Sequence, residues 1–237
     1  DLKLMRKEGV NRLSIGVQSA NNDLLKIIGR RHNFRQAITA MDNARNAGFD
    51  NVSMDLIYGL PGQSFEQWKA TLDHVLELEP EHLSCYGLKV EPNTPLWEYK
   101  DCCNLPDDDD QADMYLYACD HLGEGGFQQY EISNFSRPGF ESRHNLKYWN
   151  CEDYLGLGAA AHSFVDGKRF YHERDLTEYI GDPVSTVTDG DGGDFSEYAM
   201  LRLRLTSGLS NEKVLEKMNA LYQKNADKWV DDIVANA

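Results

Sequence analysis

An alternation of strand-like and helix-like segments in the first hundred residues limits the folds open to this chain more than any other feature. Residues 12–17 and 52–58 are short, apolar-rich runs typical of strands. Between them, apolar residues recur at helical spacing, at Phe34, Ala37, Ile38, Met41 and Ala44. The order is therefore β-α-β, in which the helix covers two parallel strands.

The same alternation continues as far as residue 95. The strand at 52–58 runs into Gly59-Leu60-Pro61-Gly62, a turn that neither a helix nor a central strand would tolerate. A capping-box pattern from Ser64 to Gln67 then predicts the start of another helix. Residues 82–90 supply a third strand, so we predict an α/β fold built from repeated β/α units.

The pattern changes in the second half of the chain. Residues 107–122 predict a helix whose inward side chains are Ala112, Tyr115, Leu116 and Cys119. Short extended pieces follow at 129–135, 160–165 and 168–172, with a hairpin turn at Asp166-Gly167. We expect two domains, a β/α region over 1–105 and a smaller α+β region over 106–237.

The last fifty residues contain one glycine-rich stretch and two helical patterns. Residues 189–194 alternate acids and glycines but lack the full spacing of a calcium loop, so we expect a mobile connector. A helix is predicted over 195–205. Another follows, with one apolar face formed by Val214, Leu215, Met218, Leu221 and Tyr222.

Charge and cysteine usage exclude some partners. A formal net charge of −15 argues against nucleic acid and anionic membranes, which are bound by clustered Lys and Arg. No apolar run reaches the roughly 20 residues of a membrane span and the start lacks a signal-peptide pattern, so we expect a cytoplasmic protein. Five cysteines without paired spacing predict free thiols rather than a zinc or iron–sulfur site.

Polar residues follow the predicted strands where ligands bind in β/α folds. Gln18, Asp55 and Lys89 each lie at or just after the carboxyl end of a strand. They are candidates for a ligand site. The alternatives are that Gln18 caps a strand end, that Asp55 is a carboxylate satisfied by backbone N–H groups, and that Lys89 is solvated.

A second candidate site is the run His144-Asn145-Leu146-Lys147-Tyr148-Trp149, which precedes the Gly/Ala-rich residues 154–162. Imidazole is a common iron ligand in heme proteins, and Tyr and Trp supply flat apolar area with a polar tip. A backbone with little side-chain bulk would let a flat ligand approach closely. The alternative is that His144 is an ordinary surface or core residue and that both aromatic rings pack inward.

Five separate runs in this chain resemble the HemN/HemW family of radical S-adenosylmethionine (SAM) proteins, in the family's order. They are NRLSIGVQS at 11–19, DLIYGLPGQS at 55–64, YEISNFSRPG at 130–139, HNLKYW at 144–149 and YLGLGAAAHS at 154–163. HNLKYW is similar to the HNxxYW signature of the heme-chaperone branch. The family's CxxxCxxC motif does not occur among the five cysteines, so we expect a fragment that starts inside the barrel.

The resemblance implies a partial (β/α)6 barrel that holds SAM and a [4Fe–4S] cluster whose ligands are not in this chain. It places SAM contacts on Gln18, Arg30 and Asp55, and more weakly on Lys89. It makes His144 the leading heme-iron ligand, with Asn145 beside it and Tyr148 and Trp149 bracketing the macrocycle. His162 is the second choice of ligand.

Three functions are compatible with these residues. The resemblance favours a heme-binding and heme-delivery protein, with heme, a heme-accepting protein and a second copy of the chain as partners. The alternative is an oxygen-independent coproporphyrinogen III oxidase of porphyrin biosynthesis, which removes two propionate carboxyls by SAM-radical chemistry. Periodicity alone supports only a β/α-barrel metabolic enzyme without radical chemistry.

Overall fold

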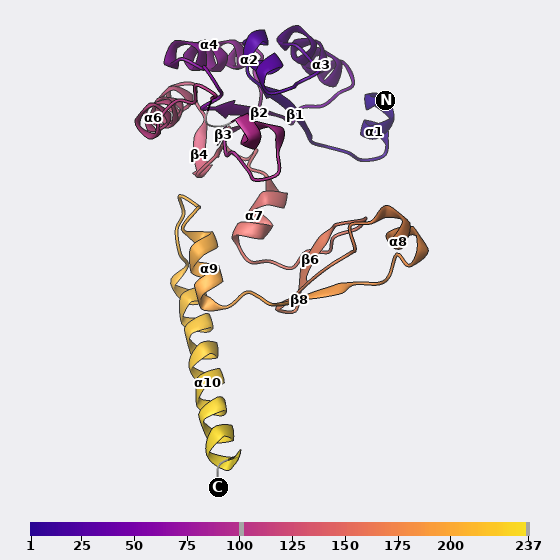
Figure 1. Ribbon diagram of the computed structural model, residues 1–237, viewed down its shortest axis with the longest axis vertical. Coiled ribbons are helices and arrows are strands. Elements are labelled where there is room, and N and C mark those ends of the chain that lie inside the picture. Colours follow the sequence, from indigo (N-terminus) through magenta and orange to yellow (C-terminus); the bar gives the residue numbers. More distant parts are fainter. Residues whose placement is uncertain (100–101, 236–237) are drawn as a thin grey trace. The chain divides into compact units, whose positions relative to one another are not determined.

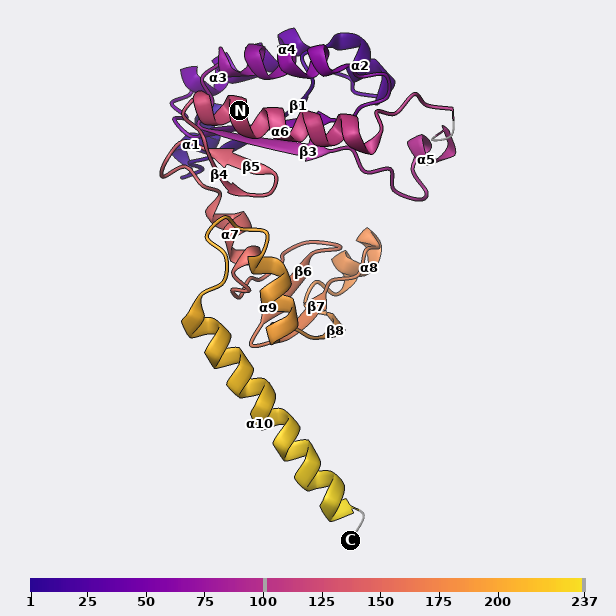
Figure 2. The ribbon, with the colours of Figure 1, turned by 90° about the vertical axis from the view of Figure 1, so that its left-hand side faces the viewer.

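The chain folds into two compact units, residues 1–141 and 142–237, which are described separately. The computed structural model describes residues 1–99 and 102–235, with side chains in the last helix given as far as residue 226 apart from residue 224. Figures 1 and 2 show the course of the chain from two directions. Among the described helices, none combines the length and apolar composition that crossing a membrane requires.

The first unit is built on a five-stranded sheet in the order β1-β2-β3-β5-β4. The strands are β1 (Leu13–Gln18), β2 (Val52–Tyr58), β3 (His82–Gly87), β4 (Gln128–Glu131) and β5 (Asn134–Ser136). The first three are parallel and the β4–β5 hairpin adds to β3 antiparallel. The parallel β/α pattern expected from the sequence is confirmed, since this is the sheet of a partial barrel.

The described part of this unit contains six helices: α1 (Leu2–Lys7), α2 (Asn22–Ile27), α3 (Phe34–Asn46), α4 (Phe65–Leu76), α5 (Pro95–Tyr99) and α6 (Asp108–Glu124). The predicted capping box is present at the start of α4, where Ser64 and Gln67 each accept a backbone N–H of the other. A second one, formed by Asn33 and Gln36, starts α3.

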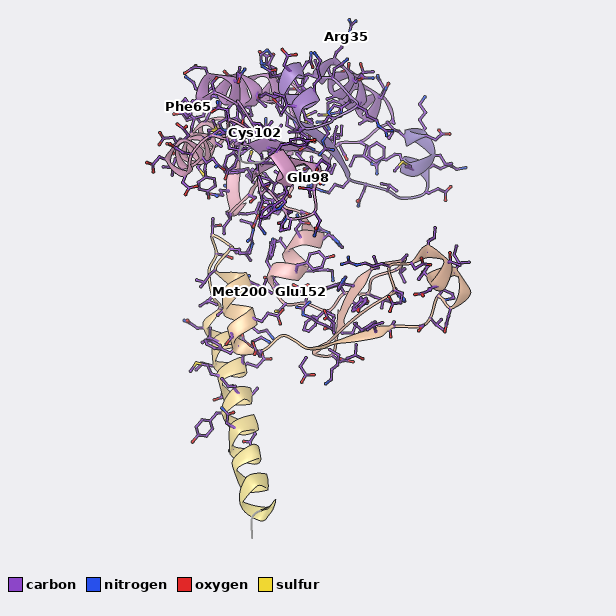
Figure 3. All side chains as sticks on the ribbon, in the orientation of Figure 1. Arg35, Phe65, Glu98, Cys102, Glu152 and Met200 are labelled. Carbon is purple, nitrogen blue, oxygen red and sulfur yellow. The ribbon has the colours of Figure 1, made fainter. Side chains whose placement is uncertain are left out.

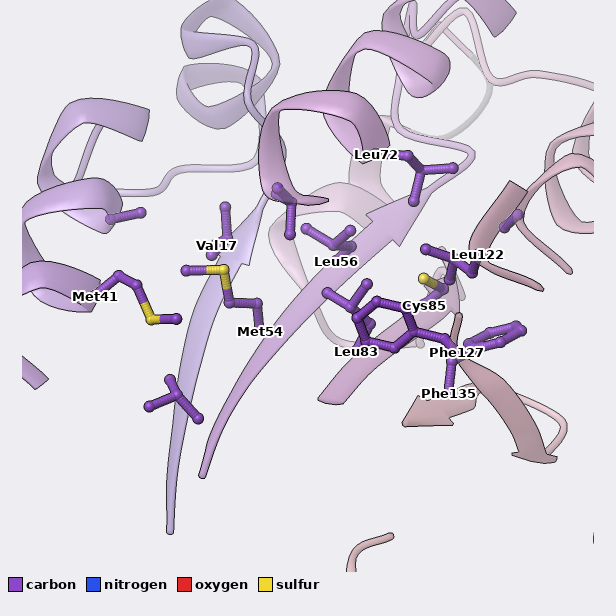
Figure 4. Close-up of a cluster of buried hydrophobic side chains, with 14 of the residues drawn as sticks. Val17, Met41, Met54, Leu56, Leu72, Leu83, Cys85, Leu122, Phe127 and Phe135 are labelled. Carbon is purple, nitrogen blue, oxygen red and sulfur yellow. The ribbon is translucent and has the colours of Figure 1, made fainter. Parts of the chain in front are cut away.

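The two faces of the parallel sheet differ in chemistry. Successive side chains of a strand point to opposite faces. Val52, Met54 and Leu56 of β2 are fully buried in the apolar core against the helices. Figure 4 shows Met54 and Leu56 in this core. The alternate residues Ser53 and Asp55 have polar side chains, and Asp55 is only partly buried. A polar face therefore lies opposite the helix-covered face.

Helices α4 and α6 are joined through one buried polar contact. The indole Nε1 of Trp68 donates to the carbonyl oxygen of Met114 at 2.8 Å. The inward face expected for α6 is wrong in part, because its buried residues are Met114, Ala118 and Leu122, whereas Leu116 is 57% exposed. The buried face differs because α6 packs against α4 and against β2, β3 and β4 at once, so these tertiary contacts decide which side chains meet the core.

The β4–β5 hairpin replaces the single extended piece expected over 129–135. Residues 132 and 133 form its turn, so the chain reverses within that stretch. Because α6 and this hairpin complete the sheet, the first unit extends to residue 141 and includes the position at 105 where the sequence suggested a domain boundary. The third strand is also shorter than the predicted 82–90, ending at Gly87.

The second unit contains a three-stranded antiparallel sheet, β6 (His162–Val165), β7 (Lys168–Tyr171) and β8 (Val187–Asp191). The helices are α7 (Arg143–Trp149), α8 (Leu176–Gly181), α9 (Phe195–Arg202) and α10 (Asn211–Ala235). Asp166 and Gly167 join β6 to β7 with φ of 50° and 73°, as the predicted two-residue hairpin turn requires.

The mobile connector expected over 189–194 is wrong in its first half. Residues 189–191 belong to β8, and Gly190 pairs with Arg169 of β7. Alternating acids and glycines suggested a loop, but a strand at a sheet edge is stabilised by backbone hydrogen bonds from its neighbour, whatever its own propensity.

Candidate functional sites

The first candidate site lies where the parallel strands end. Gln18, the last residue of β1, has φ of +67° and is buried, and the pairing with β2 shifts register between Gly16 and Gln18. A Cβ on Gly16 would lie 2.8 Å from Nε2 of Gln18. The glycine therefore leaves room for the amide of Gln18 to fold back over the strand end.

Asp55 lies on the polar face of β2, opposite Gly16 in register. Its Oδ2 accepts a hydrogen bond from the hydroxyl of Ser14 at 2.8 Å. A second hydroxyl, that of Ser53, is 3.5 Å from Oδ1. The carboxylate is held by hydroxyl groups, and since Asp55 is only partly buried it remains open to a ligand's own hydroxyl donors.

The first unit also contains a cavity of about 810 Å³. Ile57, two residues beyond Asp55 on the same face, is part of its wall, and so are Arg30 and Lys89. The remaining wall is largely apolar, formed by Ile27, Ile28, Leu88, Pro95, Leu96 and Tyr99. The structure thus brings Arg30 and Lys89 to one cavity, whereas Gln18 and Asp55 are not part of its wall.

Sequence reasoning missed a buried polar network at the opposite end of the same strands. The imidazole of His82 lies 2.8 Å from the hydroxyl of Ser53 through Nδ1 and 2.8 Å from that of Tyr130 through Nε2. Burial, with the charge of Arg12 adding to it, lowers the pKa of His82 to about 3. Residues at the amino ends of barrel strands serve stability rather than catalysis, so this network is structural.

The second candidate site is α7, which carries all four residues expected to hold a macrocycle. Ser142 caps the helix by accepting the backbone N–H of Asn145. His144 is exposed, and its Nε2 lies 2.9 Å from the hydroxyl of Tyr148, one turn later on the same face. The imidazole is therefore accessible rather than sealed in the core.

Tyr148 and Trp149 face different neighbours. The Tyr148 ring packs edge-on against Tyr154, with centroids 4.6 Å apart. Trp149 lies under the guanidinium of Arg204, 4.3 Å from the ring centre, because adjacent residues of a helix project about 100° apart. The structure thus joins Tyr148 to His144 but does not bring Trp149 onto the same face.

The Gly/Ala-rich run has small side chains because it packs closely against another segment of the same chain. A Cβ on Gly156 would lie 2.3 Å from the carbonyl oxygen of His162. The backbone N–H of Gly156 also donates to the hydroxyl of Ser163. Glycine is needed here because the chain packs against itself. At the end of the run, His162 is exposed and its ring stacks on Tyr171 at 5.1 Å.

A cavity of about 230 Å³ lies beside Tyr148, and sequence reasoning missed its polar residues. Tyr148, Tyr154 and Cys151 line it together with Arg169 and Glu197. The guanidinium of Arg169 donates to the hydroxyl of Tyr154 and pairs with the Glu197 carboxylate. This ion pair fixes Tyr154, against which Tyr148 packs.

The cysteines do not form a ligand set. Cys102, labelled in Figure 3, is exposed, whereas Cys85 is buried in the core shown in Figure 4. Over the described ranges 1–99 and 102–235, no three His, Cys, Asp or Glu side chains gather so as to hold a metal ion. Neither candidate site therefore contains the ligands of an iron–sulfur cluster.

Comparison with known proteins places the chain among radical SAM proteins. A family model described as the radical SAM superfamily matches residues 1–75. The fold resembles that of coproporphyrinogen III oxidase HemN from Escherichia coli, with a TM-score of 0.70 and 24% identity over 85% of this chain and 50% of that one.

Sequence comparison with curated relatives gives higher identities. The heme chaperone HemW of Bacillus subtilis is 39% identical over 91% of this chain and 59% of its own length. That of Lactococcus lactis is 35% identical over 98% of this chain and 63% of its own length. The chain thus spans about 60% of the length of these relatives. By its sequence and its parallel β/α sheet, it belongs to the HemN/HemW family of radical SAM proteins.

Proposed function

We propose that this chain binds heme and forms part of a heme-delivery protein. The observation that carries the proposal is its similarity, at 35–39% identity over more than nine-tenths of the chain, to proteins named heme chaperone HemW. The likeness to HemN supports the fold alone, because the identity is 24%. The oxidase alternative has less support than heme delivery.

The chemistry of α7 fits a heme site. An imidazole ligates heme iron through a ring nitrogen, which must be accessible to the metal. His144 is exposed and stands next to a phenol, a second group able to bind ferric iron. A ligand on an exposed helix face is held from one side and is released readily, which suits cargo that is passed on to an acceptor protein.

The strand-end site of the first unit fits SAM. The Asp55 carboxylate accepts hydrogen bonds from ribose hydroxyls, and Arg30 pairs with the methionine carboxylate. Lys89 and Arg30 are the charged residues of a cavity whose walls are mainly apolar, and Gln18 is a further polar group at the end of β1. SAM supplies a reactive sulfonium when bound. The described residues do not fit the [4Fe–4S] cluster, so we derive no radical step for this chain.

Titration with ferric heme tests the proposal. We expect saturable one-to-one binding with a shifted heme absorption band. The double variant His144→Ala/Tyr148→Phe should lose that shift and bind at least tenfold more weakly. A matched control is His74→Ala, an equally exposed histidine on α4. If the control and the double variant titrate identically to the parent chain, the site is not on α7.

A further inference from the structure

The contact between His144 and Tyr148 leads to an inference about which atom meets the iron. Nε2 of His144 lies 2.9 Å from the Tyr148 hydroxyl, a normal hydrogen-bond distance. The pair is spaced by four residues on one helix, so both groups point to the same side of α7. The ring nitrogen that most readily binds a metal is therefore already engaged in the folded chain.

Tyr148 is the better anchored of the two side chains. Its ring packs edge-on against Tyr154 at 4.6 Å, and it forms part of the wall of the 230 Å³ cavity. Tyr154 is itself held by Arg169, which donates to its hydroxyl at 3.2 Å. His144 is exposed and its ring contacts Tyr148 alone among the described aromatic pairs. A metal ligand must keep its direction, and only Tyr148 is fixed from behind.

We propose that Tyr148, rather than His144, is the ligand of ferric heme iron, and that His144 is its positioning partner. The proposal rests on the proposed heme binding of α7. Ferric iron accepts tyrosinate as an axial ligand. When the iron–oxygen bond forms, the phenolic O–H bond breaks and its proton passes to Nε2 of His144. The resulting imidazolium donates back to the ligated oxygen, so the charge and the protons balance within the pair.

The reverse assignment requires a contact to be lost. If Nε2 of His144 bound the iron, the Tyr148 hydroxyl would lose its partner at 2.9 Å. With Tyr148 as the ligand, the same contact is kept and becomes charge-assisted, which shortens and strengthens it. The helix then presents one preformed ligand and its partner, without a change of rotamer.

Resonance Raman spectroscopy of the ferric heme complex separates these assignments. The chain should show tyrosinate vibrations on excitation in an iron–phenolate absorption band. Tyr148→Phe, which keeps the ring packing on Tyr154 and removes only the oxygen, should abolish them and weaken binding about tenfold. His144→Ala should keep them, with a smaller loss of affinity. Tyr222→Phe, an exposed tyrosine of α10, is the matched control and should leave the spectrum unchanged.

The possible outcomes distinguish the tyrosine assignment from the proposed function. Bound heme that lacks tyrosinate vibrations overturns the assignment, and so does a spectrum that survives Tyr148→Phe but is lost in His144→Ala. Both results would leave heme binding itself intact, and the second would assign the iron to His144. Absence of saturable heme binding by the parent chain would overturn the proposed function instead, and the tyrosine assignment with it.

Discussion

The imidazole of His82 and the phenol of Tyr130 share a hydrogen bond of 2.8 Å between β3 and the β4–β5 hairpin. The other ring nitrogen of His82 meets the hydroxyl of Ser53 on β2. One neutral imidazole therefore ties together three strands of the sheet. Since His82 is 1% exposed, it cannot gain a proton without bringing a charge into this network.

We predict that this histidine makes the first unit sensitive to acid. Its pKa is about 3 in the folded chain and near 6.5 when unfolded, so protons bind preferentially to the unfolded state. The contribution of neutral His82 to the free energy of unfolding is fully present above pH 6.5. It is lost as the pH drops toward 3, by up to about 1.4 kcal/mol per pH unit.

Urea unfolding at a series of pH values measures this dependence. His82→Gln should be less stable at pH 7, because it cannot bridge both hydroxyls equally well, but its stability should vary less between pH 6.5 and 4. The exposed His74→Gln is the control, and it should reproduce the slope of the parent chain. Parallel curves for the parent chain and His82→Gln would contradict the prediction.

The bond from Trp68 to the Met114 carbonyl predicts a large effect of a conservative change. Trp68→Phe removes a buried donor, leaves part of the indole volume empty and should cost about 2–4 kcal/mol. Because this bond joins α4 to α6, their amide hydrogens should exchange faster. Trp97→Phe, at a position 38% exposed, should cost less than about 1 kcal/mol. Equal losses in the two variants would show that the bond contributes nothing.

Local pattern was enough to predict the parallel part of the fold. The bounds of β2 were predicted to the residue, and the capping box at Ser64 set the start of α4, because both depend on neighbours within a few residues. The β4–β5 hairpin and the strand at 187–191 were not found. Their pairing partners lie on other strands, and such contacts leave no periodicity in the sequence.

In the candidate sites, too, local features could be predicted and contacts between distant residues could not. Position relative to the predicted strands led to Asp55 and Lys89. The structure has Lys89 in the wall of the 810 Å³ cavity and Asp55 within β2, as the fourth of its seven residues. The contact that holds Asp55 could not be predicted, because Ser14 lies 41 residues away on the neighbouring strand. The four-residue spacing of His144 and Tyr148 was visible in the sequence. The hydrogen bond between the Tyr148 hydroxyl and Nε2 of His144 became clear only from the distance between these two atoms in the structure.

Asp55 should be the main polar contact for SAM in the first unit. Replacing it with Asn removes a charged acceptor worth roughly 1.5–3 kcal/mol, so the affinity for SAM should fall about tenfold or more. Ser14→Ala should cause a smaller loss, because its hydroxyl only orients the carboxylate. Calorimetric titration with SAM measures both. Asp50→Asn, at an exposed carboxylate, is the control. If Asp50→Asn and Asp55→Asn bind SAM with the same affinity, Asp55 is not part of the site.

Gly156 offers the sharpest test of the second unit. A methyl group at this position would lie 2.3 Å from the carbonyl oxygen of His162, a backbone atom that cannot rotate away. Gly156→Ala should therefore push residues 154–156 away from β6 and cost about 2 kcal/mol or more.

The comparison is with Gly181→Ala at the end of α8, where an added methyl group meets nothing within 4 Å. That variant should keep the stability of the parent chain to within about 0.5 kcal/mol. Hydrogen exchange of the Phe164 amide, which donates to the Tyr154 carbonyl at 2.9 Å, reports the effect directly. This amide should exchange at least tenfold faster in Gly156→Ala than in Gly181→Ala. Equal protection in the two variants would mean that the small-residue run is not required by packing and would restore its earlier interpretation as a surface for a flat ligand.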